Sequence, residues 1–296
     1  MKRTGFIAIV GRPNVGKSTL LNALLGEKIA IVSKKPQTTR NRITGILTRG
    51  EDQFVFLDTP GMHKPKTKLG NYMVNSIVGA ISDVDAAILV VEAGSKPTQV
   101  EEGIIARLTR DEIPALLCIN KTDISGAEAV GQTIERYAPL YDFKSVIPMS
   151  AMKNDGVDIV LDEAADFLFE SDWFFDEDDI TDQPERQIAA EIIREKLLRV
   201  LDDEIPHGTA VVIEAFEESK SLLKIRAEIF CERESHKRII IGKQGACLKM
   251  IGSYAREDME KFFGMKVFLD LWVKVKENWR DNDYLLSNFG YSEPKE

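Results

Sequence analysis

Gly11-Arg12-Pro13-Asn14-Val15-Gly16-Lys17-Ser18 is the most informative segment in the first half of this 296-residue chain. It fits the pattern GxxxxGK[ST] and lies between the apolar run Phe6–Val10 and the amphipathic stretch Ser18–Leu25. Glycines let such a loop wrap with its N–H groups pointing inward, and the N-terminus of the following helix favours anions. The stretch therefore predicts a phosphate-binding loop between a strand and a helix.

Individual side chains of this loop have separate expected roles. Lys17 adds a point charge for the outer phosphates, and the Ser18 hydroxyl is suited to bind Mg²⁺. We expect nucleotide contacts from the whole loop and the next residue, namely Gly11, Arg12, Pro13, Asn14, Val15, Gly16, Lys17, Ser18 and Thr19.

Up to about residue 170, apolar runs alternate with amphipathic stretches. The expected strands are Phe6–Val10, Ile43–Arg49, Gln53–Leu57, Ala86–Val91, Ala115–Ile119 and Ser145–Pro148. Unbroken Val, Ile and Leu runs joined by helices indicate an α/β domain with a mostly parallel sheet covered on both faces. The short connection Gly50-Glu51-Asp52 suits a hairpin, which predicts one antiparallel edge strand.

A second motif, Asp58-Thr59-Pro60-Gly61, follows the expected strand Gln53–Leu57. A carboxylate at the end of a strand can hold magnesium through water, and Gly61 can offer its N–H to the γ-phosphate. Such a turn is common by itself. Its position after a phosphate-binding loop makes it a candidate nucleotide contact, with Asp58 as a metal-site residue and Gly61 as a catalytic one.

A third motif, Asn120-Lys121-Thr122-Asp123, follows the strand Ala115–Ile119 and determines the base. A carboxylate there accepts two hydrogen bonds from guanine, whereas adenine would leave Asp123 unpaired at a cost of about 1–3 kcal/mol. Ser150-Ala151 is the usual companion, which presents a backbone N–H to the guanine oxygen, and Met152 follows it. The motifs together predict GTP and GDP as ligands and argue against an ATPase or nucleotide kinase.

The polar and basic stretch from Lys34 to Arg42 is typical of a mobile loop. One of its threonines is expected to reach magnesium and the γ-phosphate only in the GTP state. We favour Thr39 over Thr38, although spacing alone does not separate the two. The expected metal-site residues are therefore Ser18, Thr39 and Asp58.

Composition changes abruptly between residues 171 and 185, where six acidic residues precede Pro184. A like-charge run beside a proline indicates a solvated linker. We expect a nucleotide-binding domain over residues 1–171, an acidic linker over 172–184 and a smaller α+β domain over 185–296. The three cysteines are widely spaced, which argues against a zinc site or a disulfide framework.

The second half contains the tetrapeptide Gly242-Lys243-Gln244-Gly245 between two expected helices. A GxxG loop in that place is the signature of KH domains, where it clamps about four single-stranded nucleotides. The order of helices and strands around it resembles the type II KH arrangement. Basic residues gather nearby, so the expected RNA-binding residues are Arg233, Lys237, Arg238, Ile241, Gly242, Lys243, Gln244, Gly245 and Lys249.

Two tryptophans and three isoleucines of this half have more than one interpretation. Trp272 and Trp279 could be stacking platforms for bases, although Trp272 fits a core position better. We expect Ile239, Ile240 and Ile241 to pack in the domain core and to form the floor of the groove.

With these motifs assembled, the sequence closely resembles the Era family of bacterial Ras-like GTPases, within the TrmE-Era-EngA-YihA-Septin-like group. The phrases Glu191–Lys196 and Leu271–Lys276 extend the match over nearly the whole chain. The resemblance implies a GTPase with Mg²⁺ that binds 16S ribosomal RNA near its 3′ end and acts in 30S subunit assembly.

One departure from the Ras pattern bears on catalysis. Ras-type enzymes place a water-orienting glutamine after the DxxG glycine, whereas this chain has Met62, an apolar replacement shared by Era-like proteins. We therefore expect slow intrinsic hydrolysis. In related GTPases an asparagine at the position of Asn14 helps to bind K⁺, and we predict the same here. Lys17, Asn14, Thr39 and Gly61 are the expected catalytic residues.

The net charge of −9 argues against indiscriminate nucleic-acid binding, and we expect no DNA ligand. No apolar run is long enough to span a bilayer, and the N-terminus lacks a signal-peptide pattern. We expect a cytoplasmic monomer, with peripheral association at the inner face of the cell membrane implied by the resemblance. The alternative function is a membrane-associated or cell-cycle signalling GTPase with a protein-binding C-terminal module.

Overall fold

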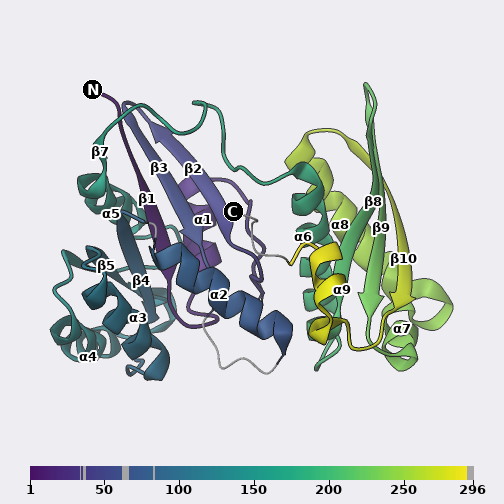
Figure 1. Ribbon diagram of the computed structural model, residues 1–296, viewed down its shortest axis with the longest axis horizontal. Coiled ribbons are helices and arrows are strands. Elements are labelled where there is room, and N and C mark those ends of the chain that lie inside the picture. Colours follow the sequence, from purple (N-terminus) through teal and green to yellow (C-terminus); the bar gives the residue numbers. More distant parts are fainter. Residues whose placement is uncertain (34, 36–37, 62–66, 83, 292–296) are drawn as a thin grey trace. The chain divides into compact units, whose positions relative to one another are not determined.

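The computed structural model describes residues 1–33, 35, 38–61, 67–82 and 84–291 of the chain. These residues form two compact units, one built mainly from residues up to Asp182 and the other mainly from Gln183 onward (Figure 1). We call them the N-terminal unit and the C-terminal unit and describe each by itself.

A mixed sheet forms the centre of the N-terminal unit. Its main strands lie in the order β2-β3-β1-β4-β5-β6, and they comprise β1 (Arg3–Val10), β2 (Ile43–Arg49), β3 (Asp52–Asp58), β4 (Ala86–Glu92), β5 (Ala115–Asn120) and β6 (Ser145–Pro148). All neighbours are parallel except β2 and β3, which form the predicted hairpin at one edge. A short strand, β7 (Phe169–Glu170), adds antiparallel to the start of β1.

Helices cover both faces of this sheet, as its apolar strands require. On one face lie α1 (Lys17–Leu25) and α5 (Val157–Ala164), which contact each other. On the other face, α2 (Lys68–Ser82), α3 (Gln99–Arg110) and α4 (Ala127–Tyr137) pack on residues of β1, β4 and β5. The predicted α/β class is confirmed, and the loops after the parallel strands meet at one edge of the sheet.

The acidic segment combines exposed carboxylates with aromatic residues that contact the edge hairpin. The buried Gln53 side chain accepts hydrogen bonds from the N–H groups of Phe174 (3.0 Å) and Phe175 (3.1 Å) and donates one to the Phe175 carbonyl (2.9 Å). Ile180 accepts a hydrogen bond of 2.9 Å from the N–H of Ile46 on the free edge of β2. The carboxylates of the acidic segment are exposed, as expected. The backbone of the segment, however, is hydrogen-bonded to the sheet.

The C-terminal unit has a three-stranded sheet in the order β10-β9-β8. Its elements are α6 (Glu185–Val200), β8 (Ala210–Glu218), β9 (Leu222–Cys231), α7 (Glu234–Ile241), α8 (Ala246–Phe263), β10 (Lys266–Val275) and α9 (Asp283–Asn288). Strand β9 pairs antiparallel with β8 and parallel with β10. The described parts of both units also contain the single-turn helices η1 (Thr122–Ile124), η2 (Ala138–Leu140), η3 (Ala165–Phe167), η4 (Pro206–Gly208), η5 (Lys243–Gly245) and η6 (Trp279–Asp281).

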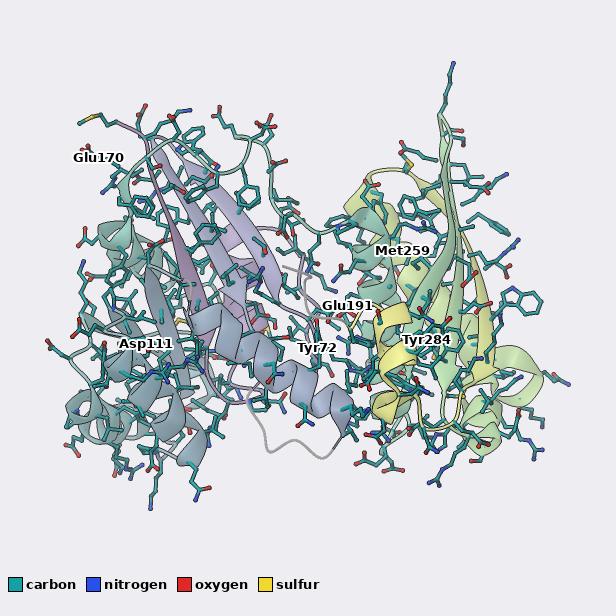
Figure 2. All side chains as sticks on the ribbon, viewed as in Figure 1. Tyr72, Asp111, Glu170, Glu191, Met259 and Tyr284 are labelled. Carbon is teal, nitrogen blue, oxygen red and sulfur yellow. The ribbon has the colours of Figure 1, made fainter. Side chains whose placement is uncertain are left out.

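The core of this unit lies between one face of the sheet and helices α6, α7 and α8. Met259 of α8, labelled in Figure 2, is fully buried there beside Ile193 of α6 and Ile229 of β9. The apolar residues of α6 are thus used inside the domain. No helix among the described residues is long and apolar enough to cross a membrane.

Two expectations for this unit are corrected by the structure. Trp279, not Trp272, is the core tryptophan, because Trp279 is fully buried and donates a hydrogen bond of 3.0 Å to the Gly208 carbonyl. Trp272 is 58% exposed on the outer face of β10. Of the three isoleucines, only Ile240 is buried, and Ile239 is exposed because a helix turns successive side chains to different sides.

Candidate nucleotide and RNA sites

The phosphate loop joins β1 to α1, as predicted, and neither of its two glycines can be replaced without a clash. Gly11 has φ +147°, and a Cβ there would lie 2.4 Å from the carbonyl oxygen of Val90. Gly16 has φ +104°, and its Cβ would lie 2.1 Å from Asn120 Nδ2. Close approach to β4 and to the base-recognition motif therefore accounts for both glycines.

Lys17 is buried at the centre of this loop. Its Nζ donates hydrogen bonds to the carbonyl oxygens of Gly11 (3.1 Å) and Arg12 (2.9 Å). Burial lowers the pKa of Lys17 to about 8, and the charge of Asp58 opposes that shift. Lys17 is therefore a desolvated cation, the kind of group that interacts strongly with a phosphate.

Ser18, Thr39 and Asp58 come together from three separate segments. Ser18 Oγ donates to Asp58 Oδ2 at 2.6 Å and lies 2.9 Å from Thr39 Oγ1. Thr39 Oγ1 also donates to Asp58 Oδ2 at 3.5 Å. The hydroxyl of Thr38 instead donates to the Lys35 carbonyl, so the structure places Thr39, and not Thr38, in the predicted metal cluster.

Asp58 has the environment expected of a carboxylate that binds a cation. Burial raises its pKa to about 6, against the opposing effects of Lys17 and the hydroxyls of Ser18 and Thr39. Its Oδ1 is buried and has no hydrogen-bond partner among the described residues. Hard oxygen donors of this kind are the ligands that Mg²⁺ prefers.

The DxxG turn packs directly on the phosphate loop. A Cβ at Gly61 would lie 2.7 Å from Cα of Pro13. The hydroxyl of Thr59 donates a hydrogen bond of 3.0 Å to the Ile9 carbonyl, which fixes the turn to β1. Met62, the residue that replaces the water-orienting glutamine, lies outside the described residues.

The base-recognition motif is connected to the phosphate loop through Asn120. Its Nδ2 donates to the Val15 carbonyl at 2.8 Å, and its Oδ1 accepts from the Ala151 N–H at 3.0 Å. Lys121 follows in the left-handed conformation, with φ +68°, and its Nζ donates to Glu92 Oε2 at 2.9 Å. Asn120 thus joins the ends of β5 and β6 to the loop after β1.

Asp123 and Ser150, predicted from distant motifs, are hydrogen-bonded to each other. Ser150 Oγ donates to Asp123 Oδ1 at 2.7 Å, which orients the carboxylate. Met152 follows and is 70% exposed. Among the residues that the structure describes, the second oxygen of Asp123 accepts no hydrogen bond, so it is available to donors on a base edge.

Sequence reasoning missed two acidic residues of this region, Glu92 and Glu101. Glu92 ends β4 and binds Lys121. Glu101 belongs to a capping box with Thr98 at the start of α3 and lies 2.5 Å from Arg12 of the phosphate loop. The T-x-x-E spacing of Thr98 and Glu101 is a recognisable helix-start signal, but no local pattern links it to Arg12.

In the C-terminal unit, the tetrapeptide Gly242–Gly245 forms a tight turn between α7 and α8. Gly242, Gln244 and Gly245 have positive φ angles of +74°, +52° and +79°. A Cβ at Gly242 would lie 2.7 Å from Cβ of Cys247, whereas nothing lies within 4 Å of one at Gly245. Gly242 is thus required by packing as well as by backbone conformation.

The predicted RNA-binding side chains lie on this turn and along the two helices that it joins. They come from α7 and its N-cap, from the turn and from α8, and they comprise Arg233, Lys237, Arg238, Lys243, Gln244 and Lys249. All but Lys237 are exposed, and Lys237 is half-buried. Ile241 is half-buried and packs against the domain core. The structure therefore places exposed cations on the turn and on the helices next to it, which suits a phosphate backbone.

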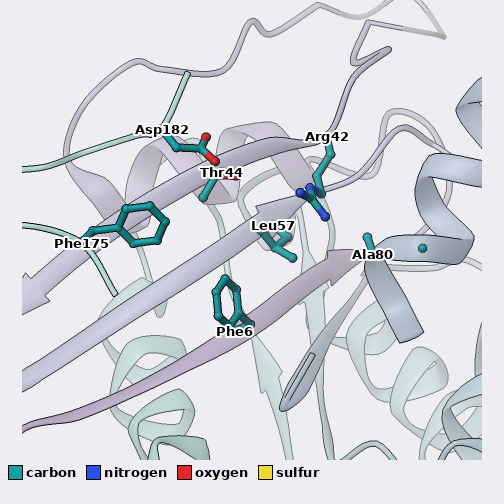
Figure 3. A pocket seen from close by; sticks show the side chains of 8 residues that line it. Phe6, Arg42, Thr44, Leu57, Ala80, Phe175 and Asp182 are labelled. Atoms are coloured by element: carbon teal, nitrogen blue, oxygen red, sulfur yellow. The ribbon is translucent and has the colours of Figure 1, made fainter. Parts of the chain in front are cut away.

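A separate hollow of about 320 Å³ lies between the edge of the sheet, α2 and the acidic segment (Figure 3). It shares no residue with the predicted nucleotide contacts. Its lining residues are Phe6, Arg42, Thr44, Leu57, Gly79, Ala80, Phe175 and Asp182.

Comparisons with known proteins agree with this two-site arrangement. Residues 6–121 match the family model described as a 50S ribosome-binding GTPase, and residues 204–280 match the KH domain. The GTPase Era of Ruminiclostridium cellulolyticum is 51% identical over 294 residues, which cover 99% of both chains. The GTPase Era of Clostridium kluyveri is 49% identical over 98% of this chain and 100% of its own.

This chain belongs to the Era GTPase family. Its fold matches that of a single-residue variant of Aquifex aeolicus Era bound to GDP and AlF4⁻ with a TM-score of 0.94, at 38% identity over 98% of this chain and 100% of the other. An Era structure in complex with MgGDPNP and nucleotides 1506–1542 of 16S ribosomal RNA matches with a TM-score of 0.92, at 36% identity. That match covers 99% of this chain and 100% of the other.

Membership of the Era family makes the protein a GTPase with a KH domain at its C-terminal end. Two predictions from sequence, the fold class and the hydrolysis of GTP, are thereby confirmed.

Proposed function

We propose that this protein is a GTP-driven switch that binds single-stranded 16S ribosomal RNA near its 3′ end. In this role it would act in 30S subunit assembly and RNA processing. One observation carries the proposal, namely that a single chain joins a guanine-nucleotide site to a KH turn flanked by cations. The related Era structure bound to nucleotides 1506–1542 of 16S ribosomal RNA supports the choice of ligand.

We further propose that Mg²⁺ binds beside Ser18, Thr39 and Asp58. The buried Asp58 Oδ1 without a partner among the described residues and the two nearby hydroxyls fit this ion. When bound, Mg²⁺ neutralises charge on the nucleotide phosphates. The relative bound to MgGDPNP supports this assignment.

In the proposed mechanism, positioning and charge stabilisation supply most of the catalysis. Lys17 offers a desolvated ammonium to the outer phosphates, and the loop N–H groups orient them. Gly61, which rests on Pro13, brings its N–H to the same region. Asp123, oriented by Ser150, selects guanine by accepting its two donors.

Asn14 is the proposed contact of a K⁺ ion that supplies the charge an arginine finger gives elsewhere. It is exposed at the phosphate loop in a left-handed conformation, with φ +65°. GTPase rates measured in KCl and in NaCl of equal concentration test this role. Faster hydrolysis in KCl that N14A abolishes is expected, and equal rates in the two salts would disprove it.

The RNA half of the proposal depends on the turn Gly242–Gly245. K243D/Q244D places two negative charges where a phosphate backbone would lie, so binding to a short 16S 3′-end RNA should be lost while GTP binding stays normal. K220D/S221D, in the exposed turn between β8 and β9, changes the charge by the same amount and serves as the control. Equal RNA affinity of wild type and K243D/Q244D would place the RNA site elsewhere.

A direct test of the switch compares RNA binding with GDP and with a non-hydrolysable GTP analogue. We expect affinities that differ between the two nucleotides and fall steeply with salt. If the protein binds no RNA with either nucleotide, the alternative is favoured, namely a membrane-associated or cell-cycle signalling GTPase. We also propose that the protein is a cytoplasmic monomer. Its proposed peripheral association with the membrane is tested by measuring its binding to anionic vesicles.

A further inference from the structure

Arg12, although part of the phosphate loop, directs its side chain to a helix on the rim of the site. Its Nε lies 2.5 Å from Glu101 Oε1 on α3. The Arg12 side chain is 27% exposed, whereas that of Glu101 is fully buried. The ion pair thus joins the phosphate loop to α3, although Arg12 and Glu101 are far apart in sequence.

Glu101 is held in place by further polar groups. Its Oε2 accepts hydrogen bonds from the Thr98 N–H (3.1 Å) and from the Thr98 hydroxyl. Burial raises the pKa of the Tyr137 hydroxyl on α4, and the nearby charge of Glu101 raises that pKa further. The carboxylate that Arg12 contacts therefore lies among polar groups of α3 and α4, and Arg12 provides its positive counter-charge.

The backbone of Arg12 contacts the catalytic lysine. Its carbonyl accepts the 2.9 Å hydrogen bond from Lys17 Nζ. The next residue, Pro13, is the surface on which Gly61 rests, since a Cβ on Gly61 would come within 2.7 Å of it. A shift of Arg12 would therefore move a hydrogen-bond partner of Lys17 and the support of the DxxG turn together.

We propose that the Arg12–Glu101 ion pair is a positioning element of the nucleotide site, which holds the first half of the phosphate loop so that bound nucleotide is retained. A buried carboxylate without its counter-charge is strongly unfavourable. Removing the Arg12 side chain therefore forces α3 or the phosphate loop to rearrange. Removing the negative charge of Glu101 leaves the Arg12 side chain without the partner that holds it in position. In both cases the loop N–H groups lose their fixed orientation toward phosphate.

The test measures the release rate of fluorescent GDP from the full-length protein carrying R12A, E101Q or both. We expect about 5–20-fold faster release from each single variant, and no further increase in the double variant, because coupled residues show non-additive effects. R12K keeps a positive charge that can reach Glu101, so it should restore release to within about two-fold of wild type. Glutamine has nearly the same shape and size as glutamate, so E101Q removes the charge without leaving a cavity that could cause misfolding.

A second ion pair of the same unit supplies the matched control. Arg3 and Asp52, on β1 and β3, form a bidentate pair with distances of 2.7 and 2.6 Å. D52N should lower the melting temperature without changing GDP release. If R12A and E101Q also lower the melting temperature and leave release unchanged, the pair is only structural and the proposal is wrong. Additive effects in the double variant would overturn it as well.

Discussion

Ser18 Oγ and Asp58 Oδ2 are joined by a hydrogen bond of 2.6 Å, although the two residues are 40 positions apart. Ser18 is the second residue of α1, directly after the phosphate loop, and Asp58 is the last residue of β3. This contact brings the phosphate loop and the DTPG motif together, with Thr39 beside them, in one candidate cation site. Asp58 is buried in that site.

The first prediction concerns the pH dependence of stability. Burial raises the pKa of Asp58 to about 6, so its contribution to stability is fully present below about pH 4 and is lost as the pH rises through 6. In EDTA, wild type should lose about 1–2 kcal/mol more stability than D58N between pH 5 and pH 7.5. Urea unfolding at both values measures this, with the exposed D142N variant as control. Parallel losses in wild type and D58N would contradict the raised pKa.

The second prediction concerns base selection. D123N replaces a double acceptor with an amide that donates as well as accepts, so GDP affinity should fall by about 10–100-fold. Xanthosine diphosphate, whose second carbonyl can accept from the new amide, should bind better than it does to wild type. Titration calorimetry with both nucleotides measures the change. Unaltered GDP affinity would show that Asp123 does not contact the base.

A third prediction separates the two glycines of the turn Gly242–Gly245, the proposed RNA site. G242A places a Cβ 2.7 Å from Cβ of Cys247, whereas G245A meets nothing within 4 Å. A positive φ costs both variants about 1–2 kcal/mol, and G242A adds a packing cost of about 1–3 kcal/mol. Thermal unfolding and RNA binding should therefore be damaged more by G242A. Equal effects would mean that contact with Cys247 has no part in shaping the turn.

The fourth prediction uses the two tryptophans. W279A removes a fully buried ring and its hydrogen bond to the Gly208 carbonyl, so it should destabilise the KH domain by about 3–5 kcal/mol. W272A removes a ring that is 58% exposed and should cost about 0.5 kcal/mol or less. Chemical unfolding of both variants provides the comparison. A larger loss in W272A would show that β10 buries that side against a partner.

Much of the fold was predictable because local pattern and fold agree. The apolar runs that became β4 and β5 are buried throughout or nearly so, as a parallel sheet with two covered faces requires. The prediction that Trp272 is the core tryptophan was wrong, because the sequence around the two tryptophans does not show which of them is buried. Trp272 lies within β10 and Trp279 in η6 beyond it, and only the pairing of β10 with β9 decides that Trp272 faces outward.

The acidic segment shows a similar limit. Its charge run predicted a solvated stretch, and its carboxylates are exposed. The aromatic residues between them, Phe174 and Phe175, were the overlooked signal. The centre of the Phe174 ring lies 5.0 Å from that of the Phe6 ring in β1. The hydrogen bonds to Gln53 come from the backbone N–H groups of Phe174 and Phe175, so no side-chain pattern predicts them.

Three short motifs, GxxxxGKS, DTPG and NKTD, were enough to predict the chemistry of this protein, because each specifies backbone shape and functional groups within a few residues. Which of the distant groups contact one another follows from the folded chain. It placed Thr39 rather than Thr38 beside Ser18, and it paired Arg12 with Glu101. These relationships depend on strand order and helix packing, which bring distant residues within hydrogen-bonding distance and remove them from water.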